Sequence, residues 1–260
     1  NKEYIDGVEN IITGAGDDII YGDDQINKII TGAGDDIIRG GAEADIIDGG
    51  TNTAVGDTAD FSDLAYGVTV DLDTDNDDSN TAVGTALSNG KTDSLTDIEN
   101  VTGTVRADDI TGDDKNNTII SGDDNDVIRG LEGTDYIDGG VGDDDTVDYS
   151  KGTQGLIIDL SATQTFGDDT TYSVQDDGFG NKEFTANIEN VIGTSSVDII
   201  IGNDKDNKLE AGANADTLYG GTGNDTLVGG AGADTFRGGT GDDIIYGNTE
   251  STSSADSDRD

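Results

Sequence analysis

The chain has 260 residues, of which 32% are hydrophobic, and its 57 acidic residues against 13 basic ones give a formal net charge of −44. A surface this negative repels nucleic-acid phosphates and anionic lipids, and no apolar run approaches the ~20 residues of a membrane-spanning helix. We therefore expect no nucleic-acid partner and no membrane insertion. Cys and His are absent, so disulfides are excluded and any bound metal must be held by oxygen. This composition is typical of a disordered chain unless cations neutralise the carboxylates.

A nine-residue repeat starts close to the N-terminus. Its first two lines, TGAGDDIIY and GDDQINKII (residues 13–30), carry Asp or Asn at the sixth place and an aliphatic residue at the eighth. The next two lines, residues 31–48, keep this register. The fifth line loses it, and Asp57 takes the place of the acid after a short insertion. Because the repeat already occupies the first 30 residues, we see no secretory signal there.

The same pattern returns twice, which divides the chain into blocks. We assign residues 1–57, 98–147 and 188–247 to three repeat blocks, and the last contains GGTGNDTLV, GGAGADTFR and GGTGDDIIY. An acidic low-complexity segment that only solvates is the competing interpretation. The row of eighth-place aliphatic residues has no role in such a segment and argues against it.

A longer period is superimposed on the nonapeptide. The triplets Val8-Glu9-Asn10, Ile98-Glu99-Asn100 and Ile188-Glu189-Asn190 each introduce a block and recur at a spacing of 90 residues. The chain is thus three copies of one long unit, with the third truncated. Repetition on this scale predicts a solenoid rather than a globule.

Two segments between the blocks, residues 58–97 and 148–187, interrupt the repeat. Each opens alike, with Asp60-Phe61-Ser62 or Asp148-Tyr149-Ser150, and then alternates apolar and polar residues as a half-buried strand does. Acidic loops follow at Asp73–Asn80 and Asp168–Gly180. We interpret these excursions as wider coils of one continuous solenoid, with small β subdomains beside it as the alternative. Residues 248–260 are polar and predict a linker or frayed end.

The lines of the repeat, such as GGTGNDTLV, resemble those of the RTX (hemolysin-type calcium-binding repeat) family. The resemblance implies an all-β, right-handed parallel β-helix, or β-roll, with three calcium-binding blocks and two side-loop excursions. In that fold the first six residues of a line form a turn and the last three a strand, and two lines make one coil. Lines n and n+2 therefore stack, and several Ca²⁺ ions lie between stacked turns.

The residue types suit this role, because glycines permit the positive φ angles of a tight turn and carboxylates suit Ca²⁺ at about 2.3–2.6 Å. The expected ligands are the sixth-place acids Asp18, Asp36, Asp45, Asp126, Asp135, Asp144, Asp216, Asp225, Asp234 and Asp243. Lines that depart from the family pattern supply the weaker candidates Asn27, Asp57, Asp108, Asn117, Asp198 and Asn207. Without the ion, stacked carboxylates repel one another, so we expect the chain to fold as it binds calcium.

No catalytic constellation stands out. Carboxylates are so frequent and periodic that an acid pair carries no information, and nucleophilic relays lack His or Cys. We therefore expect no enzyme but a calcium-dependent structural module of a bacterial S-layer protein, adhesin or extracellular filament, exported by type I secretion. Such a module would contact itself, other surface proteins or glycans. The alternative is the non-catalytic C-terminal module of a secreted RTX enzyme or toxin, and glycan or partner binding through the excursion loops is a third hypothesis.

Overall fold

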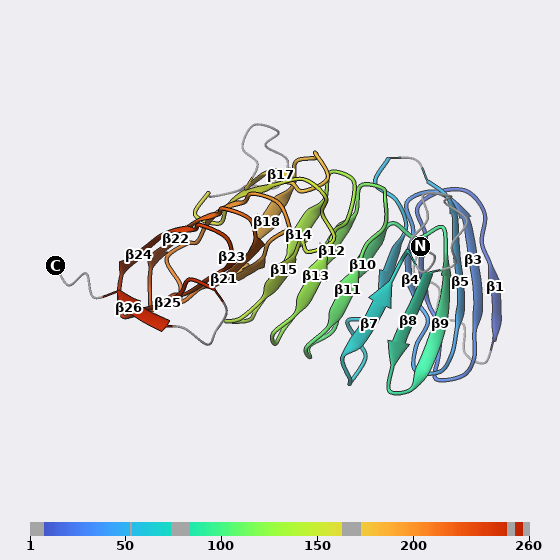
Figure 1. Ribbon diagram of the computed structural model, residues 1–260. Helices are drawn as coiled ribbons and strands as arrows, with labels where there is room; N and C mark the ends of the chain where they lie inside the picture. The colour runs from blue at the N-terminus through green and yellow to red at the C-terminus, as the bar shows by residue number, and fades with distance from the viewer. Residues whose placement is uncertain (1–7, 53, 74–83, 163–172, 249–252, 257–260) are drawn as a thin grey trace.

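The computed structural model describes residues 8–52, 54–73, 84–162 and 173–248, together with the backbone of 253–256. These residues form short strands that stack into an elongated solenoid, with β1 at one end and β24 to β26 at the other (Figure 1). The strands belong to three sheets, of which the longest runs the whole length of the stack. Among the described residues no helix has the length and apolar character that crossing a membrane requires.

Sheet 1 has 14 strands. Their order across the sheet is β1 (Asn10–Ile12), β3 (Lys28–Ala33), β5 (Ile46–Thr51), β9 (Lys91–Thr96), β8 (Gly84–Ser88), β7 (Val68–Asp71), β11 (Asp109–Thr111), β13 (Val127–Arg129), β15 (Thr146–Asp148), β19 (Asn190–Ile192), β21 (Lys208–Ala213), β23 (Thr226–Ala231), β25 (Asp243–Tyr246) and β26 (Ser253–Asp256).

The other side of the solenoid is divided between two sheets. Sheet 2 contains β18 (Phe184–Ala186), β14 (Tyr136–Asp138), β12 (Thr118–Ile120), β10 (Asn100–Thr102), β6 (Thr58–Asp60), β4 (Ile37–Arg39) and β2 (Ile19–Tyr21). Sheet 3 contains β17 (Val174–Asp177), β16 (Leu156–Asp159), β20 (Ile199–Ile201), β22 (Thr217–Thr222) and β24 (Thr235–Thr240). Within the repeat blocks, consecutive lines alternate between sheet 1 and the sheet opposite.

Strand pairing within the blocks is parallel and follows the predicted register. Ile11 pairs with Ile29 in sheet 1 and Ile20 pairs with Ile38 in sheet 2. The same offset of two lines joins Leu209 to Leu227 in the last block. Two nonapeptides therefore make one coil, and lines n and n+2 stack as expected. The predicted parallel solenoid is confirmed.

The core is a column of eighth-place side chains inside the coils. These side chains are fully buried, namely Ile29, Ile38, Ile47, Ile110, Ile119, Ile128, Ile137, Ile200, Leu209, Leu218 and Leu227. Each buried aliphatic side chain contributes about 1.5–3 kcal/mol.

Both excursions are continuous with the sheets. Strands β7, β8 and β9 form an antiparallel meander inside sheet 1, between β5 and β11. In the second excursion β16 pairs with β17 in antiparallel fashion and with β20 in parallel, while β18 extends sheet 2. The described strands of both excursions therefore belong to the same three sheets as the strands of the repeat blocks. The loop predicted at Asp73–Asn80 lies outside the described residues except for Asp73. The loop predicted at Asp168–Gly180 is described from residue 173 onward, and the prediction is wrong for Val174–Asp177, which form β17 because they pair with β16.

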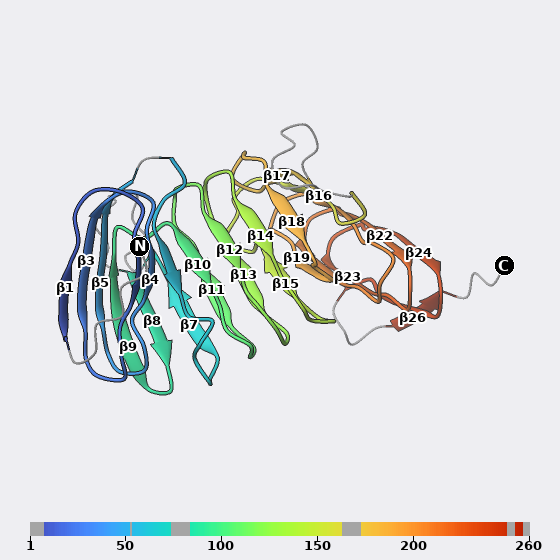
Figure 2. The same cartoon turned by 180° about the vertical axis from the view of Figure 1, so that it is seen from behind.

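Successive long units start on opposite sides of the solenoid. Asn10 on β1 and Asn190 on β19 lie in sheet 1, whereas Asn100 on β10 lies in sheet 2. Each unit therefore contains an odd number of half-coils. As a result the extra strands β7–β9 lie on one side, whereas β16 and β17 lie on the other (Figure 2).

The C-terminal segment differs from its prediction in one respect. Residues 248–260 contain no repeat, yet the backbone of β26 (Ser253–Asp256) pairs with β25 in antiparallel fashion. This strand covers the edge of sheet 1, which would otherwise expose unpaired main-chain groups.

Candidate metal sites

The sixth-place carboxylates form ladders that run from coil to coil. The main-chain N–H of Asp18 donates to Oδ1 of Asp36 at 2.7 Å, and that of Asn207 donates to Oδ1 of Asp225 at 2.9 Å. The N–H of Asp225 in turn donates to Oδ1 of Asp243 at 2.9 Å. Each acid is thus anchored by the turn one coil before it, and the turns of neighbouring coils are held in contact.

Glycine makes this close contact between turns achievable. Gly221, at the second place of its line, has a φ of +116°, and a Cβ atom there would lie 2.3 Å from the carbonyl oxygen of Asn203 in the preceding coil. Gly220, at the first place, faces Oδ2 of Asp225, which would lie 2.2 Å from an added Cβ. The first glycine therefore leaves open the space in front of the carboxylate.

The second oxygen of these carboxylates is buried and has no hydrogen-bond partner among the described residues. This holds for Oδ2 of Asp36, Asp45, Asp57, Asp126, Asp135, Asp145, Asp216, Asp225 and Asp234. A buried unpaired polar atom costs about 1–3 kcal/mol, and more when it is charged. Oxygen atoms in this state suit a hard divalent cation, so the donor set fits Ca²⁺.

Burial also makes these carboxylates difficult to ionise without a cation. Loss of hydration raises the pKa of Asp45, Asp126 and Asp225 to about 6, against the lowering effect of the main-chain hydrogen bonds that they accept. The pKa of Asp145 rises to about 7 for the same reason, with nearby Asp126 adding to the effect. At neutral pH a bound cation or a bound proton therefore stabilises each of these buried carboxylates.

Comparison with models of protein families identifies the family of this repeat. The model of the RTX calcium-binding nonapeptide repeat matches residues 5–25, 21–53, 102–145, 192–227 and 219–250. The chain belongs to this RTX family. It is a calcium-binding β-roll module of a type that is characteristic of secreted bacterial proteins, and the β-roll is a structural rather than a catalytic fold. The search of curated proteins finds no match.

In the RTX lines with Asn at the sixth place, the Asn side chain makes hydrogen bonds that satisfy its own turn. Oδ1 of Asn117 accepts the main-chain N–H of Asp113 at 2.9 Å, and its Nδ2 donates to the carbonyl oxygen of Glu99 at 2.8 Å. Asn207 makes the equivalent bonds to Asn203 and Glu189. The amide thus supplies contacts of the turn by itself, and none of these lines leaves a buried unpaired oxygen among the described residues.

Two further weak candidates are also satisfied without an ion. Oδ2 of Asp108 accepts the N–H of Thr104 at 2.6 Å, and its Oδ1 accepts the N–H of Val68 at 2.7 Å. Asp198 makes the same pair of bonds to Thr194 and Leu156. Asn27 accepts the N–H of Asp23 in the same way. The structure therefore separates these residues from the RTX acids that keep an unpaired oxygen.

The fifth line of the second block requires a correction. Asp144 occupies the sixth place by counting, but its side chain is exposed, and Asp145 is the buried residue that accepts the N–H of Asp126 at 2.8 Å. The line contains one extra residue, because Val127 pairs with Thr146, one position beyond the usual offset. The expected equivalent in the first block, Asp57, does lie in the ladder.

The ladders also include acids that the sequence analysis did not assign. Asp93 accepts the N–H of Asp45 at 2.9 Å, and Glu99 and Glu189 accept those of Asp57 and Asp145 at 3.1 Å. Asp93 belongs to SNGKTDSLT, which keeps the acid and the aliphatic residue of an RTX line but starts with Ser. Glu99 and Glu189 are the middle residues of the recurring Ile-Glu-Asn triplets, and this recurrence is the sequence signal that could have identified them.

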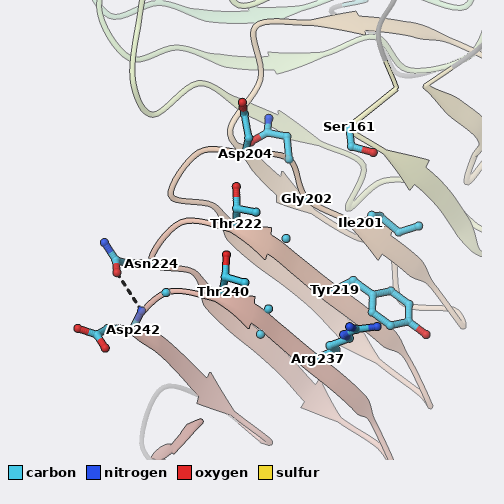
Figure 3. Close-up of a pocket in the computed structure, with 15 residues that line it drawn as sticks. Ser161, Ile201, Gly202, Asp204, Tyr219, Thr222, Asn224, Arg237, Thr240 and Asp242 are labelled. Atoms are coloured by element: carbon cyan, nitrogen blue, oxygen red, sulfur yellow. Dashed lines mark hydrogen bonds between the residues drawn. The ribbon is translucent and has the colours of Figure 1, made fainter. Parts of the chain in front are cut away.

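An open groove lies apart from the ladders, on the outer surface of sheet 3. It has a volume of about 970 Å³ and crosses several coils, with Tyr219 and Arg237 on one flank and Thr222 and Thr240 on the other (Figure 3). None of the sixth-place acids lines it. Among the described residues Arg237 forms no ion pair, whereas the ninth-place Arg39 and Arg129 each bind an Asp on the next strand of their sheet.

Proposed function

We propose that this chain is a calcium-stiffened structural segment of a bacterial surface or extracellular protein of the S-layer, adhesin or filament type. The observation that carries the proposal is the ladder of buried carboxylates, nine of which are held by one oxygen and have no partner for the other among the described residues. Such a ladder is unfavourable without cations and rigid with them. A rod whose stiffness depends on calcium suits the outside of the cell, where calcium is abundant.

Folding on binding follows from the same energetics. Aliphatic burial in the narrow core is small for a chain of this length, and unpaired acids oppose stacking of the coils. Calcium binding to the folded form alone supplies the missing free energy. A chain that stays unfolded at low calcium can pass through a type I secretion channel and fold after export.

The groove of Figure 3 supports association of one copy with another. In sheets 1 and 2, the guanidinium groups of Arg129 and Arg39 bind Asp148 and Asp60 on the following strand. Arg237 lies on β24, which is the edge strand of sheet 3 in the described part of the chain, so no described strand follows it there. A strand from a second copy that adds to β24 would place a carboxylate beside Arg237, which forms no ion pair among the described residues.

The runner-up is a non-catalytic module of a secreted RTX enzyme or toxin. The antiparallel strand β26 favours it, because a strand in that direction blocks the addition of a further parallel coil to sheet 1. Glycan or partner binding through the excursion loops is a third candidate, which deletion of the loops in a cell-adhesion assay tests.

Electron microscopy of the calcium-loaded chain separates the first two functions. The structural proposal predicts rods that join end to end at high protein concentration, and it predicts that Arg237→Glu leaves single rods. Single rods for the unmodified chain at every concentration would favour the enzyme or toxin module.

A further inference from the structure

Two acids of neighbouring coils meet where the second excursion rejoins the solenoid. Asp135 precedes β14 and Glu183 precedes β18, and these strands pair so that Tyr136 lies opposite Phe184. The side chains of both acids are fully buried. A third fully buried acid, Asp177, ends β17 in the same excursion.

Each of the three carboxylates is fixed by one oxygen and unpaired at the other. Oδ1 of Asp135 accepts the N–H of Asn117 at 2.8 Å, and Oε2 of Glu183 accepts the hydroxyl of Tyr149 at 2.6 Å. Oδ1 of Asp177 accepts main-chain N–H groups of its own turn, including that of Gly180 at 2.9 Å. Oδ2 of Asp135, Oδ2 of Asp177 and Oε1 of Glu183 have no partner among the described residues.

The unpaired oxygens of Asp135 and Glu183 point to one place. A Cβ atom on Gly130 would lie 2.3 Å from Oδ2 of Asp135 and 3.1 Å from Oε1 of Glu183. Both oxygens therefore face the side of Gly130 that carries no side chain. A methyl group at this position would collide with the carboxylate of Asp135.

No basic side chain neutralises this cluster within the described part of the chain. None of the ion pairs formed there includes Asp135, Asp177 or Glu183. Burial raises the pKa of Asp135 to about 8, and burial together with the charge of Asp135 raises that of Glu183 well above its usual range. Asp135 and Glu183 therefore lie together without a counter-charge among the described residues, and the charge of Asp177 acts on both.

The first excursion provides a contrast at the corresponding positions. Asp93 lies 90 residues before Glu183, and its Oδ1 accepts the N–H of Asp45 and so continues the ordinary ladder. In the opening triplet Asp60-Phe61-Ser62, Phe61 stands where Tyr149 stands in the second excursion, and Leu87, 90 residues before Asp177, is not acidic. The longer Glu183, the hydroxyl of Tyr149 and the extra carboxylate of Asp177 are thus particular to the second excursion.

We propose that Asp135 and Glu183 hold a divalent cation, best Ca²⁺, at the junction of the second excursion with the solenoid, and that Asp177 supplies a third negative charge beside it. No three acidic side chains among the described residues are grouped as a complete metal-binding cluster, so two carboxylates and other oxygens make up the coordination. Glu183 and Asp177 lie outside the recognised nonapeptide lines. The ion would fasten the excursion to the second block, and the inference rests on the calcium binding proposed above.

Calcium anomalous diffraction from crystals grown with Ca²⁺ tests this site directly. The expected result is a peak between Asp135 and Glu183 in the unmodified chain, which falls to background in Glu183→Gln. Gln keeps an oxygen that can accept from Tyr149, while the charge is removed. The matched variant Asp93→Asn, in the first excursion, should keep the peak.

The controls distinguish failure of the site from failure of the function. Peaks beside Asp225 and Asp234 with none at Glu183 would overturn this inference alone and would indicate that the two acids share a proton. A peak at Asp135 that survives Glu183→Gln would also overturn it, because the turn alone would then hold the ion. Absence of every peak would contradict the calcium function itself. If Glu183→Gln does not fold, the presence or absence of an anomalous peak between Asp135 and Glu183 in the unmodified chain tests the site.

Discussion

The main-chain N–H of Asn207 donates to Oδ1 of Asp225 at 2.9 Å, while Oδ2 of Asp225 is buried without a partner. The two oxygens of this carboxylate thus have different roles, one in the fold and one in metal binding. One oxygen sets the spacing of adjacent coils through a main-chain hydrogen bond, and the other carries charge that needs a cation. Substitutions can therefore separate the structural contact from the calcium contact.

Replacement of Asp225 by Asn tests that separation. Asn keeps an oxygen for the N–H of Asn207 but removes the charge, so we expect about tenfold weaker calcium binding at that site, equivalent to ~1.4 kcal/mol. The calcium midpoint for folding, followed by circular dichroism, should rise. Asp206→Asn is the control, because Asp206 is exposed and bonds the N–H of Asn224 at the surface. An equal midpoint for the two variants would contradict the assignment.

A methyl group on Gly221 should disrupt the contact between coils. Gly221 has a φ of +116° and its added Cβ would lie 2.3 Å from the carbonyl oxygen of Asn203, so Gly221→Ala should cost more than ~2 kcal/mol of unfolding free energy. Urea unfolding in saturating calcium measures the loss. Gly247→Ala, where no atom lies within 4 Å of the added Cβ, should change little. Similar losses for both variants would argue against tight stacking of the turns.

The ion pair of Arg129 should contribute to stability, whereas Arg237 should not. Nε of Arg129 lies 2.9 Å from Oδ2 of Asp148, whose side chain is 10% exposed. Arg129→Met leaves that acid without its partner and should cost about 1–2 kcal/mol in urea unfolding with calcium. Arg237→Met is the matched variant, and the monomer should lose nothing. Equal stability of the Arg129 variant and the unmodified chain would show that the pair is solvent-screened.

Acid should partly replace calcium in folding the chain. Burial raises the pKa of Asp45 and Asp225 to about 6 and that of Asp145 to about 7, above the ~3.9 of an unfolded Asp. A raised pKa means that the folded form binds protons more tightly, so these groups favour folding below pH ~4 and lose this contribution as pH rises through 6 to 7.

Far-UV circular dichroism in EDTA should therefore show more β structure at pH 4.5 than at pH 7.5. Calcium binding has the opposite pH dependence, because protons compete with calcium for the carboxylates. The calcium concentration at the midpoint of folding should therefore be higher at pH 5 than at pH 7.5. An EDTA spectrum that does not change over this range would contradict the burial of ionisable acids.

The regular part of the fold was predictable because two rows of residues keep one period. Ile29 and Leu227 lie in the core by virtue of the eighth place alone, and Asp36 and Asp225 lie in the ladders by virtue of the sixth. A parallel coil of two lines brings residues of equal place together, so local spacing determines the long-range contacts.

Insertions limited the rest of the prediction. Three consecutive acids, Asp143 to Asp145, fit the motif in more than one register, and only the pairing of Val127 with Thr146 selects Asp145 over Asp144. The excursions also contain segments that stack like repeat lines but lack the glycine spacing. Glu183 lies in such a segment, and only the pairing of β18 with β14 aligns it with Asp135. The odd number of half-coils in each unit depends on these inserted strands and cannot be counted from the repeat.

Calcium-dependent folding is the claim on which the function depends, and a calcium titration of the EDTA-treated chain at pH 7.5 tests it most directly. Circular dichroism and small-angle X-ray scattering should report an expanded chain without β signal in EDTA, and a compact β rod after calcium is added, with Mg²⁺ far less effective. A chain that keeps its β signal and its compact dimensions in EDTA would contradict the account.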